Sequence, residues 1–137
     1  RRARAAQEGH VEAGMQALLT PSDLLTLRKT LSSVYIEERI ERFTIELVSA
    51  TRQLDRYIPE WGGYVKAGAS PRASIALLQA ATASALLDQR DYVIPEDIHS
   101  LAVDVLRHRL VLSFSAKADG VTEEAIIHRL LETLPAV

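Results

Sequence analysis

Residues 68–87 read GASPRASIALLQAATASALL, and this stretch decides the fold. Ser70 followed by Pro71 is typical of a helix start, because serine caps the first turn and proline suits its first position. The helix is expected to reach about Leu87. Its apolar residues form two stripes: Ile75, Leu78, Ala81 and Ala85 on one side, and Leu77, Ala80, Ala83 and Leu87 on another. An alanine-rich helix that is apolar over much of its circumference belongs at the centre of a bundle.

Four further helices are predicted around it. One opens at Thr20-Pro21-Ser22-Asp23 with a capping box, and another opens at Pro95-Glu96-Asp97 with acids in its first turn. Residues 37–56 carry an apolar stripe at helical spacing, and Thr122 caps a last helix that ends at Pro135. Residues 57–69 and 113–121 are expected to be loops, and residues 91–94 and 110–112 to be extended. The predicted fold class is all-α, a small bundle of about five helices.

Composition limits the possible functions. The chain has 137 residues, 47% hydrophobic and 25% charged, which suits one domain with a core. Its net charge of −2 lacks the basic excess that non-specific nucleic-acid binding needs. The absence of cysteine excludes disulfides and thiolate metal sites, and no apolar run approaches the roughly 20 residues of a membrane span. Residues 1–7 are basic, but no apolar region follows them, so no signal peptide is expected.

Motifs of the common enzyme classes are missing. The sequence holds no Gly-x-x-x-x-Gly-Lys-Ser/Thr loop to cradle phosphates and no dinucleotide fingerprint. The histidines His10, His99, His108 and His128 have no partner at a metal-binding helical spacing, so no metal site is predicted. Judged from its own residues, this chain is not expected to catalyse a reaction.

One constellation suits a ligand, at the start of the 70–87 helix. Arg72 places a guanidinium in the first turn, where the backbone N–H groups near Ala73 and Ser74 are expected to lack helical partners. The helix dipole and the planar fork of arginine both favour a phosphate at such a corner. The alternative is an ordinary helix start whose arginine is solvated or paired with a carboxylate.

Four blocks in a fixed order resemble the C-terminal lid of MoxR-type AAA+ ATPases. They read GASPRAS at residues 68–74, LLQAA at 77–81, DYVIPEDI at 91–98 and VLRHRL at 105–110. Residues 19–24, residues 47–52 and the tail from Gly120 also fit the pattern. The resemblance therefore covers the chain from about residue 10.

The resemblance implies a function. In this family the lid packs against an α/β P-loop core domain, the nucleotide lies between them, and the arginine of the Ser-Pro-Arg block is sensor 2, which reaches the ATP phosphates. By motif match this arginine is Arg72, with Ser70 and Ala73 beside the nucleotide. ATP with Mg²⁺ would be bound mainly by a core domain that precedes Arg1, so no ATP hydrolysis is expected from this chain alone.

The same resemblance implies an organisation. Residues 1–19 would be the end of an inter-domain helix and a connecting segment, and residues 20–137 the lid domain. The implied partners are the protein's own core domain, neighbouring subunits of a homo-oligomeric ring, and an unidentified protein client of a chaperone-like machine in the cytoplasm. The chain begins at Arg1 rather than at methionine, which suits a piece of a longer protein.

Residues 55–67 depart from the family pattern, because this link is longer and more aromatic than usual. Tyr57, Trp61 and Tyr64 could anchor a protein partner, which would make the chain a free-standing helical adaptor. The preferred interpretation is that they fold back over the seam between the two neighbouring helices.

Arg107-His108-Arg109 is a small basic cluster at a helix end, where positive charge complements the helix dipole. A helix-turn-helix that binds nucleic acid is the third interpretation, and the acidic net charge disfavours it.

Overall fold

The structure, a computed structural model, describes residues 17–135. It divides into two units between Ser32 and Ser33, and each unit is described by itself. The first carries α1 (Pro21–Thr30), followed by the short 3₁₀ turn η1 (Leu31–Ser33). The helix end predicted at residues 1–8 and most of the connecting segment lie outside the described residues.

The start of α1 agrees with its sequence signature. The Thr20 hydroxyl accepts the Asp23 N–H at 3.2 Å, and the Asp23 carboxylate accepts the Thr20 N–H at 2.7 Å. Both halves of the predicted capping box are therefore formed. No residue of α1 is buried.

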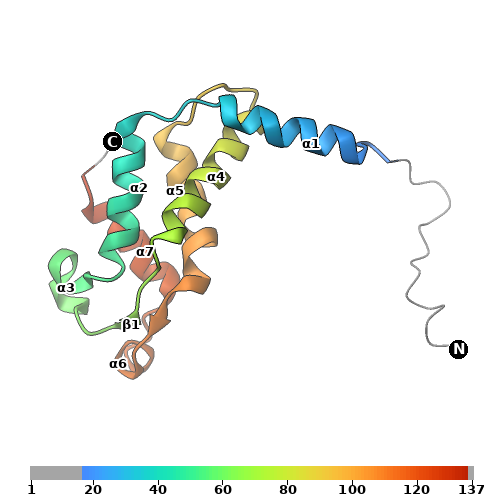
Figure 1. Ribbon diagram of the computed structural model, residues 1–137. Helices are drawn as coiled ribbons and strands as arrows, with labels where there is room; N and C mark the ends of the chain where they lie inside the picture. The colour runs from blue at the N-terminus through green and yellow to red at the C-terminus, as the bar shows by residue number, and fades with distance from the viewer. Residues whose placement is uncertain (1–16, 136–137) are drawn as a thin grey trace, which may run out of the picture. The chain divides into compact units, whose positions relative to one another are not determined.

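The second unit is a helical bundle with one small sheet, which confirms the predicted all-α class (Figure 1). Its elements are α2 (Glu38–Ala50), α3 (Leu54–Tyr57), η2 (Pro59–Trp61), β1 (Val65–Ala67), α4 (Arg72–Leu87), α5 (Pro95–Leu106), η3 (Arg107–Arg109), β2 (Val111–Leu112), α6 (Phe114–Ala118) and α7 (Glu123–Thr133). The helix α4 packs against α5 and α2, and α7 packs against α5 and α2 as well. None of the helices in residues 17–135 has the length and apolar composition needed to cross a bilayer.

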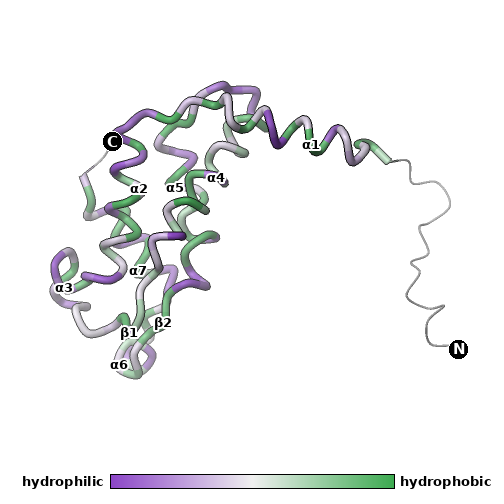
Figure 2. The backbone as a smooth tube through the Cα atoms, viewed as in Figure 1, coloured by the Kyte–Doolittle hydropathy of each residue, from purple (hydrophilic) through white to green (hydrophobic). Residues whose placement is uncertain are grey.

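The central position predicted for α4 is correct, but its predicted faces are partly wrong. The fully buried side chains are Ala73, Leu77, Ala81 and Ala85, spaced four residues apart along one side. Ile75 is 58% exposed and Leu87 is 84% exposed, although both were expected in apolar stripes. Figure 2 shows mostly hydrophobic or neutral residues along α4. A helix that is apolar nearly all round does not reveal which side its neighbours will cover.

The helix predicted over residues 37–56 is interrupted. Its stripe is buried as expected, from Ile40 to Leu54, but α2 ends at Ala50 and the chain turns before α3. The Thr51 hydroxyl donates back to the Val48 carbonyl at 2.7 Å, which satisfies one of the carbonyls left open at the end of the helix. The turn frees Thr51 and Arg52 to contact the segment that precedes α4.

Both segments predicted as loops contain short elements. Residues 57–69 include η2 and β1, and residues 113–121 include α6, which the Ser113 hydroxyl caps by accepting the Ala116 N–H. The strands are antiparallel, with Val65 opposite Leu112. The extended character predicted for residues 110–112 is confirmed by β2, as is the helix start at Thr122, whose hydroxyl accepts the Ala125 N–H.

A short link turns the chain from α4 into α5. Gln89 adopts a left-handed backbone conformation with φ of 59°, which ends α4. The Arg90 N–H returns to the Ala85 carbonyl at 2.8 Å. Beyond it, Tyr92 forms an isolated parallel bridge with Tyr35, so the link runs extended as predicted.

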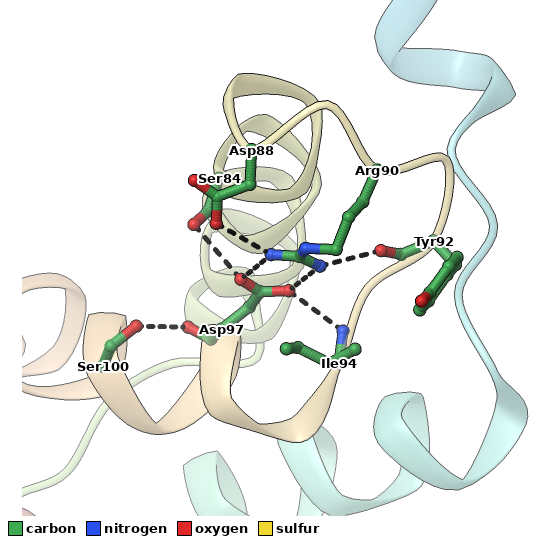
Figure 3. A network of polar contacts seen from close by, with 7 residues as sticks. All are labelled: Ser84, Asp88, Arg90, Tyr92, Ile94, Asp97 and Ser100. Atoms are coloured by element: carbon green, nitrogen blue, oxygen red, sulfur yellow. Dashed lines mark hydrogen bonds and ion pairs between the residues drawn. The ribbon is translucent and has the colours of Figure 1, made fainter.

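A largely buried ion pair holds this link (Figure 3). The two terminal nitrogens of Arg90 donate to the two carboxylate oxygens of Asp97 at 2.8 and 2.7 Å. Asp97 also accepts the Ile94 N–H at 2.9 Å and the Ser84 hydroxyl at 3.2 Å. One carboxylate therefore joins α4, the link and the first turn of α5.

The pKa of Asp97 reflects this environment. Burial of the carboxyl raises its pKa, but the hydrogen bonds from Arg90, Ile94 and Ser84 and the charge of Arg90 outweigh burial. The pKa of Asp97 in the folded chain therefore lies below its ordinary value. Folding is favoured by this carboxylate above its unfolded-state pKa, and the benefit is lost as the pH falls through the lowered folded-state value.

We expect Asp97→Asn to lower the free energy of unfolding by about 2–3 kcal/mol at pH 7. This is less than the roughly 3–5 kcal/mol for a fully buried pair, because the Arg90 side chain is 19% exposed. Urea unfolding between pH 7 and pH 3 measures it, and the gap between wild type and variant should narrow as the pH falls. Glu38→Gln removes an exposed ion pair with Arg42 and serves as the control, with a loss below about 0.5 kcal/mol. If wild type and Asp97→Asn differed by the same free energy of unfolding at every pH, the lowered pKa of Asp97 would be contradicted.

Candidate functional site

Arg72 is the first residue of α4, and its side chain is exposed. Among the arginines between Ser33 and Pro135, it alone makes no hydrogen bond, ion pair or ring contact within the described structure. The others are engaged: Arg39 with Glu37, Arg42 with Glu38, Arg90 with Asp88 and Asp97, Arg107 with Asp104 and Glu124, Arg129 with Glu60 and Glu132, Arg52 and Arg109 with backbone carbonyls, and Arg56 with the Tyr57 ring. All donors of the Arg72 guanidinium are therefore open to a ligand.

The first turn of α4 differs from the expected anion-binding corner. The Ala73 N–H donates to the Ser70 carbonyl at 2.8 Å, and the Ser74 N–H donates to the Pro71 carbonyl at 3.1 Å. These two amides are thus used within a tight turn of the 3₁₀ kind, and the prediction that they are free is wrong. The Ser70 side chain makes no capping hydrogen bond either, so the cap is provided by its backbone carbonyl.

The sequence-predicted site residues differ in accessibility. Ser70 and Arg72 are exposed, whereas Ala73 is fully buried. A ligand at the start of α4 therefore meets the Arg72 guanidinium and the Ser70 hydroxyl and does not reach the Ala73 side chain. The placement of Ser70 and Ala73 beside a nucleotide stays a prediction.

One face of α4 continues from Arg72. Ile75 and Gln79 are exposed and lie three and seven residues further on, so the three side chains share a helix face. Ile75 is a large apolar residue on the surface, one turn from an unpaired cation. This face therefore combines a charged group with apolar surface.

The segment before α4 is held by the end of α2, a contact that the sequence analysis did not assign. The Ala69 N–H donates to the Thr51 hydroxyl at 2.9 Å, and the Arg52 guanidinium donates to the Ala69 carbonyl. The only sequence signal was that Thr51 and Arg52 stand in one of the blocks that carry the family resemblance. A contact across 18 residues leaves no local pattern by which sequence reasoning could find it.

The aromatic residues of the 55–67 segment pack against the core. Tyr57, Trp61 and Tyr64 are each half-buried against it, and the Trp61 and Tyr64 rings stack with centroids 6.3 Å apart. The Tyr64 hydroxyl donates to the Asp119 carboxylate, and this bond raises the pKa of Tyr64. The packing agrees with the folded-back interpretation, and a partner-binding role for these residues stays untested.

The basic cluster Arg107-His108-Arg109 forms η3, directly after α5. Arg107 lies 3.7 Å from Glu124 of α7, and the Arg109 side chain donates to the Val105 carbonyl at 2.9 Å. These contacts fit the structural interpretation of the cluster at a helix end. Within residues 17–135, no group of three or more histidine, aspartate or glutamate side chains is placed to hold a metal ion.

The chain is similar to known proteins in both sequence and structure. A family model described as the AAA lid domain matches residues 63–130, which include all of α4 and α5. The chain is 38% identical over 118 residues to chaperone MoxR1 of Mycobacterium tuberculosis, covering 85% of this chain and 31% of that protein. It is 35% identical over 128 residues to the uncharacterized protein YeaC of Bacillus subtilis, covering 93% and 38%.

A solved structure is similar as well. The crystal structure of a candidate ATPase from Cytophaga hutchinsonii superposes with a TM-score of 0.81 and 39% sequence identity. The match covers 85% of this chain and 36% of that one. The chain thus spans about a third of the length of the relatives that it matches.

We expect Trp61→Ala to lower the free energy of unfolding by about 2 kcal/mol, roughly half the cost of truncating a fully buried aromatic side chain. The reason is that the indole is half-buried against the core and stacks on Tyr64. Phe114→Ala is the control, because Phe114 is 87% exposed and its truncation should change stability by less than about 0.5 kcal/mol. Urea unfolding of both variants makes the comparison. Unchanged stability of the Trp61 variant would instead favour the partner-anchor interpretation.

Proposed function

Because this chain carries the lid domain of a MoxR-family AAA+ ATPase, we propose that Arg72 is its sensor 2 arginine. In this role the guanidinium contacts the phosphates of ATP held by the core domain of the whole protein. The observation that carries the proposal is the state of Arg72, which is exposed at the start of α4 and unpaired while the other arginines of the unit are engaged.

The donor set of the chain suits a phosphate but does not form a complete nucleotide site. Arg72 offers a permanently charged planar fork, which matches phosphate oxygens better than a point charge does. The Ser70 hydroxyl is exposed nearby, whereas the Ala73 N–H is already bonded to the Ser70 carbonyl. ATP with Mg²⁺ supplies the negatively charged phosphates, and the role of this chain is to bind and orient those phosphates from one side.

The same face of α4 suits contact with the core domain. Ile75 and Gln79 lie on the face that begins with Arg72, so a domain that brings ATP to the arginine would cover them too. Covering Ile75, which is 58% exposed, removes apolar surface from water and favours the closed arrangement. The arginine and the apolar surface therefore act together when the nucleotide is bound.

The free energy of one charge-assisted hydrogen bond is too small for Arg72 to supply the affinity for ATP, so the core domain would supply most of it. A charge-assisted hydrogen bond contributes about 1.5–3 kcal/mol, whereas a millimolar dissociation constant already needs about 4 kcal/mol. Arg72 alone therefore gives no useful affinity, and the isolated chain should bind ATP with a dissociation constant weaker than about 1 mM. The contact suffices to bias the position of the lid, so losing phosphate charge on hydrolysis would release the lid as a rigid body.

The assembly follows from the family context. We propose that the whole protein forms a homo-oligomeric ring in which the lid contacts its own core domain and a neighbouring subunit, and that the movement acts on a protein client. The adaptor alternative relied on Tyr57, Trp61 and Tyr64 as anchors for a protein partner. Their packing against the core gives it no support.

We expect Arg72→Ala in the full-length protein to lower kcat/KM for ATP by about 10- to 150-fold, which corresponds to losing about 1.5–3 kcal/mol of charge-assisted bonding. Arg72→Lys should fall between the alanine variant and wild type, because it keeps the charge but loses the fork. Steady-state ATPase assays measure both variants.

Arg39→Ala is the matched control for this prediction. Arg39 is also exposed, lies on α2 and is paired with Glu37, so its loss should leave ATP turnover unchanged. Circular dichroism and thermal unfolding should show that both alanine variants are folded. Wild-type turnover in Arg72→Ala would refute the sensor role.

A further inference from the structure

The backbone that leads into α4 lies against the end of α2. A Cβ atom added at Gly68 would stand 2.5 Å from the Thr51 carbonyl oxygen and 2.6 Å from its carbonyl carbon. Both neighbours are backbone atoms and cannot move aside as a flexible side chain would. The two segments therefore approach so closely that only glycine fits at position 68.

The next residue is bonded at both of its backbone polar groups. The Ala69 N–H donates to the Thr51 hydroxyl at 2.9 Å, and the Ala69 carbonyl accepts from the Arg52 guanidinium. The same Arg52 nitrogen lies 3.5 Å from the Val48 carbonyl, in the last turn of α2. The side chains of Thr51 and Arg52, at the end of α2, thus provide hydrogen-bond partners for both backbone polar groups of Ala69. This residue is fully buried and lies three positions before Arg72.

Further backbone bonds hold the first turn of α4. The Ser70 carbonyl accepts the Ala73 N–H, and Pro71 has a ring-fixed φ while its carbonyl accepts the Ser74 N–H. These bonds join the first turn of α4 to the segment that the end of α2 holds. The position of the Arg72 backbone depends on the end of α2.

We propose that Thr51 and Arg52 are positioning residues for Arg72, because they fix the start of α4 to the end of α2 and so set where the guanidinium meets a phosphate. This inference rests on the proposed function of Arg72. Neither residue touches the nucleotide in this arrangement. Both act through the Ala69 backbone.

The role goes beyond holding α4 in the fold. The helix is anchored along its length by buried residues, namely Leu77, Ala81 and Ala85, and its C-terminal end is tied down by the Arg90–Asp97 pair. Losing the Thr51 contact should therefore leave α4 folded and packed. The loss should instead let the first turn of α4 move more freely. The contact between Arg72 and a phosphate is sensitive to such movement, because it tolerates only small changes in geometry.

Three threonine variants in the full-length protein test this. Thr51→Val nearly preserves shape and removes the acceptor of the Ala69 N–H, whereas Thr51→Ser keeps an acceptor there. Thr44→Val is the matched control, because Thr44 lies within α2, is fully buried like Thr51, and its hydroxyl donates only to the Ile40 carbonyl at 2.8 Å. The readouts are the KM and kcat for ATP, the dissociation constant of fluorescently labelled ADP, and hydrogen exchange of the peptide that contains Ala69.

Thr51→Val is expected to raise the KM for ATP by at least about fivefold, the lower end of typical coupling between distant sites. The Ala69 amide should exchange faster in this variant. Thr51→Ser and Thr44→Val should stay within about twofold of wild type. Equal effects of Thr51→Val and Thr44→Val would overturn the proposal, since any buried threonine would then behave alike.

A double variant separates this inference from the function on which it rests. If Thr51 acts through Arg72, Thr51→Val should add nothing to the loss already caused by Arg72→Ala. A further loss of the same size in the Arg72→Ala background would overturn the positioning role. Normal turnover in Arg72→Ala alone would refute the sensor function itself. An impaired Arg72→Ala beside a normal Thr51→Val would refute only the positioning role.

Discussion

The second unit depends on the burial of one side of α4 between its neighbours. The buried side chains of this helix are small except for Leu77, so α2 and α5 can approach its backbone closely. Burial against two helices fixes the axis of α4 but leaves its ends to other interactions. Polar contacts hold both ends: the Arg90–Asp97 pair where the chain leaves α4, and the side chains of Thr51 and Arg52 where it enters.

These two polar contacts differ in what they do. Asp97 bonds Arg90, Ile94 and Ser84 together, so it closes the connection from α4 to α5. The contact at the start of α4 is made by the Thr51 hydroxyl and the Arg52 guanidinium, and it lies three residues before Arg72, which has no partner within the described residues 33–135. This contact fixes the backbone without placing a carboxylate next to Arg72. The cation thus stays available to an outside anion.

Local chemistry made much of the fold predictable. The starts of α1, α5 and α7 were found because proline, threonine and acidic residues act within four positions of one another. The stripe of α2 was found because it is apolar on one side only. The strand β1 and its pairing with β2 were missed, since each strand has at most three residues and the two pair across more than 40 positions of sequence. Short elements of this kind are stabilised by their neighbours and leave little signal of their own.

In the candidate site, too, local sequence predicted one part and missed another. Its arginine was identified from a motif, but the hydrogen bonding of the first turn of α4 was predicted wrongly. The Ala73 N–H bonds to the Ser70 carbonyl instead of staying free. Tight turns of this kind are common at helix ends, and the sequence does not distinguish them from a regular first turn. The contact of Ala69 with Thr51 was also hidden, since it joins residues 18 positions apart.

A stiff start of α4 matters because the available energy is small. Moving a two-state equilibrium from one extreme to the other takes about 5.5 kcal/mol, whereas one charge-assisted contact provides about 1.5–3 kcal/mol. In the proposed function, Arg72 would therefore switch the lid only if the open and closed arrangements are nearly balanced beforehand. The arginine would also have to transmit that energy to the whole domain instead of losing it to motion of its own turn. The bonds that join Ala69 to the end of α2 provide a connection of this kind, because they link the start of α4 to α2, and the buried side of α4 packs against α5.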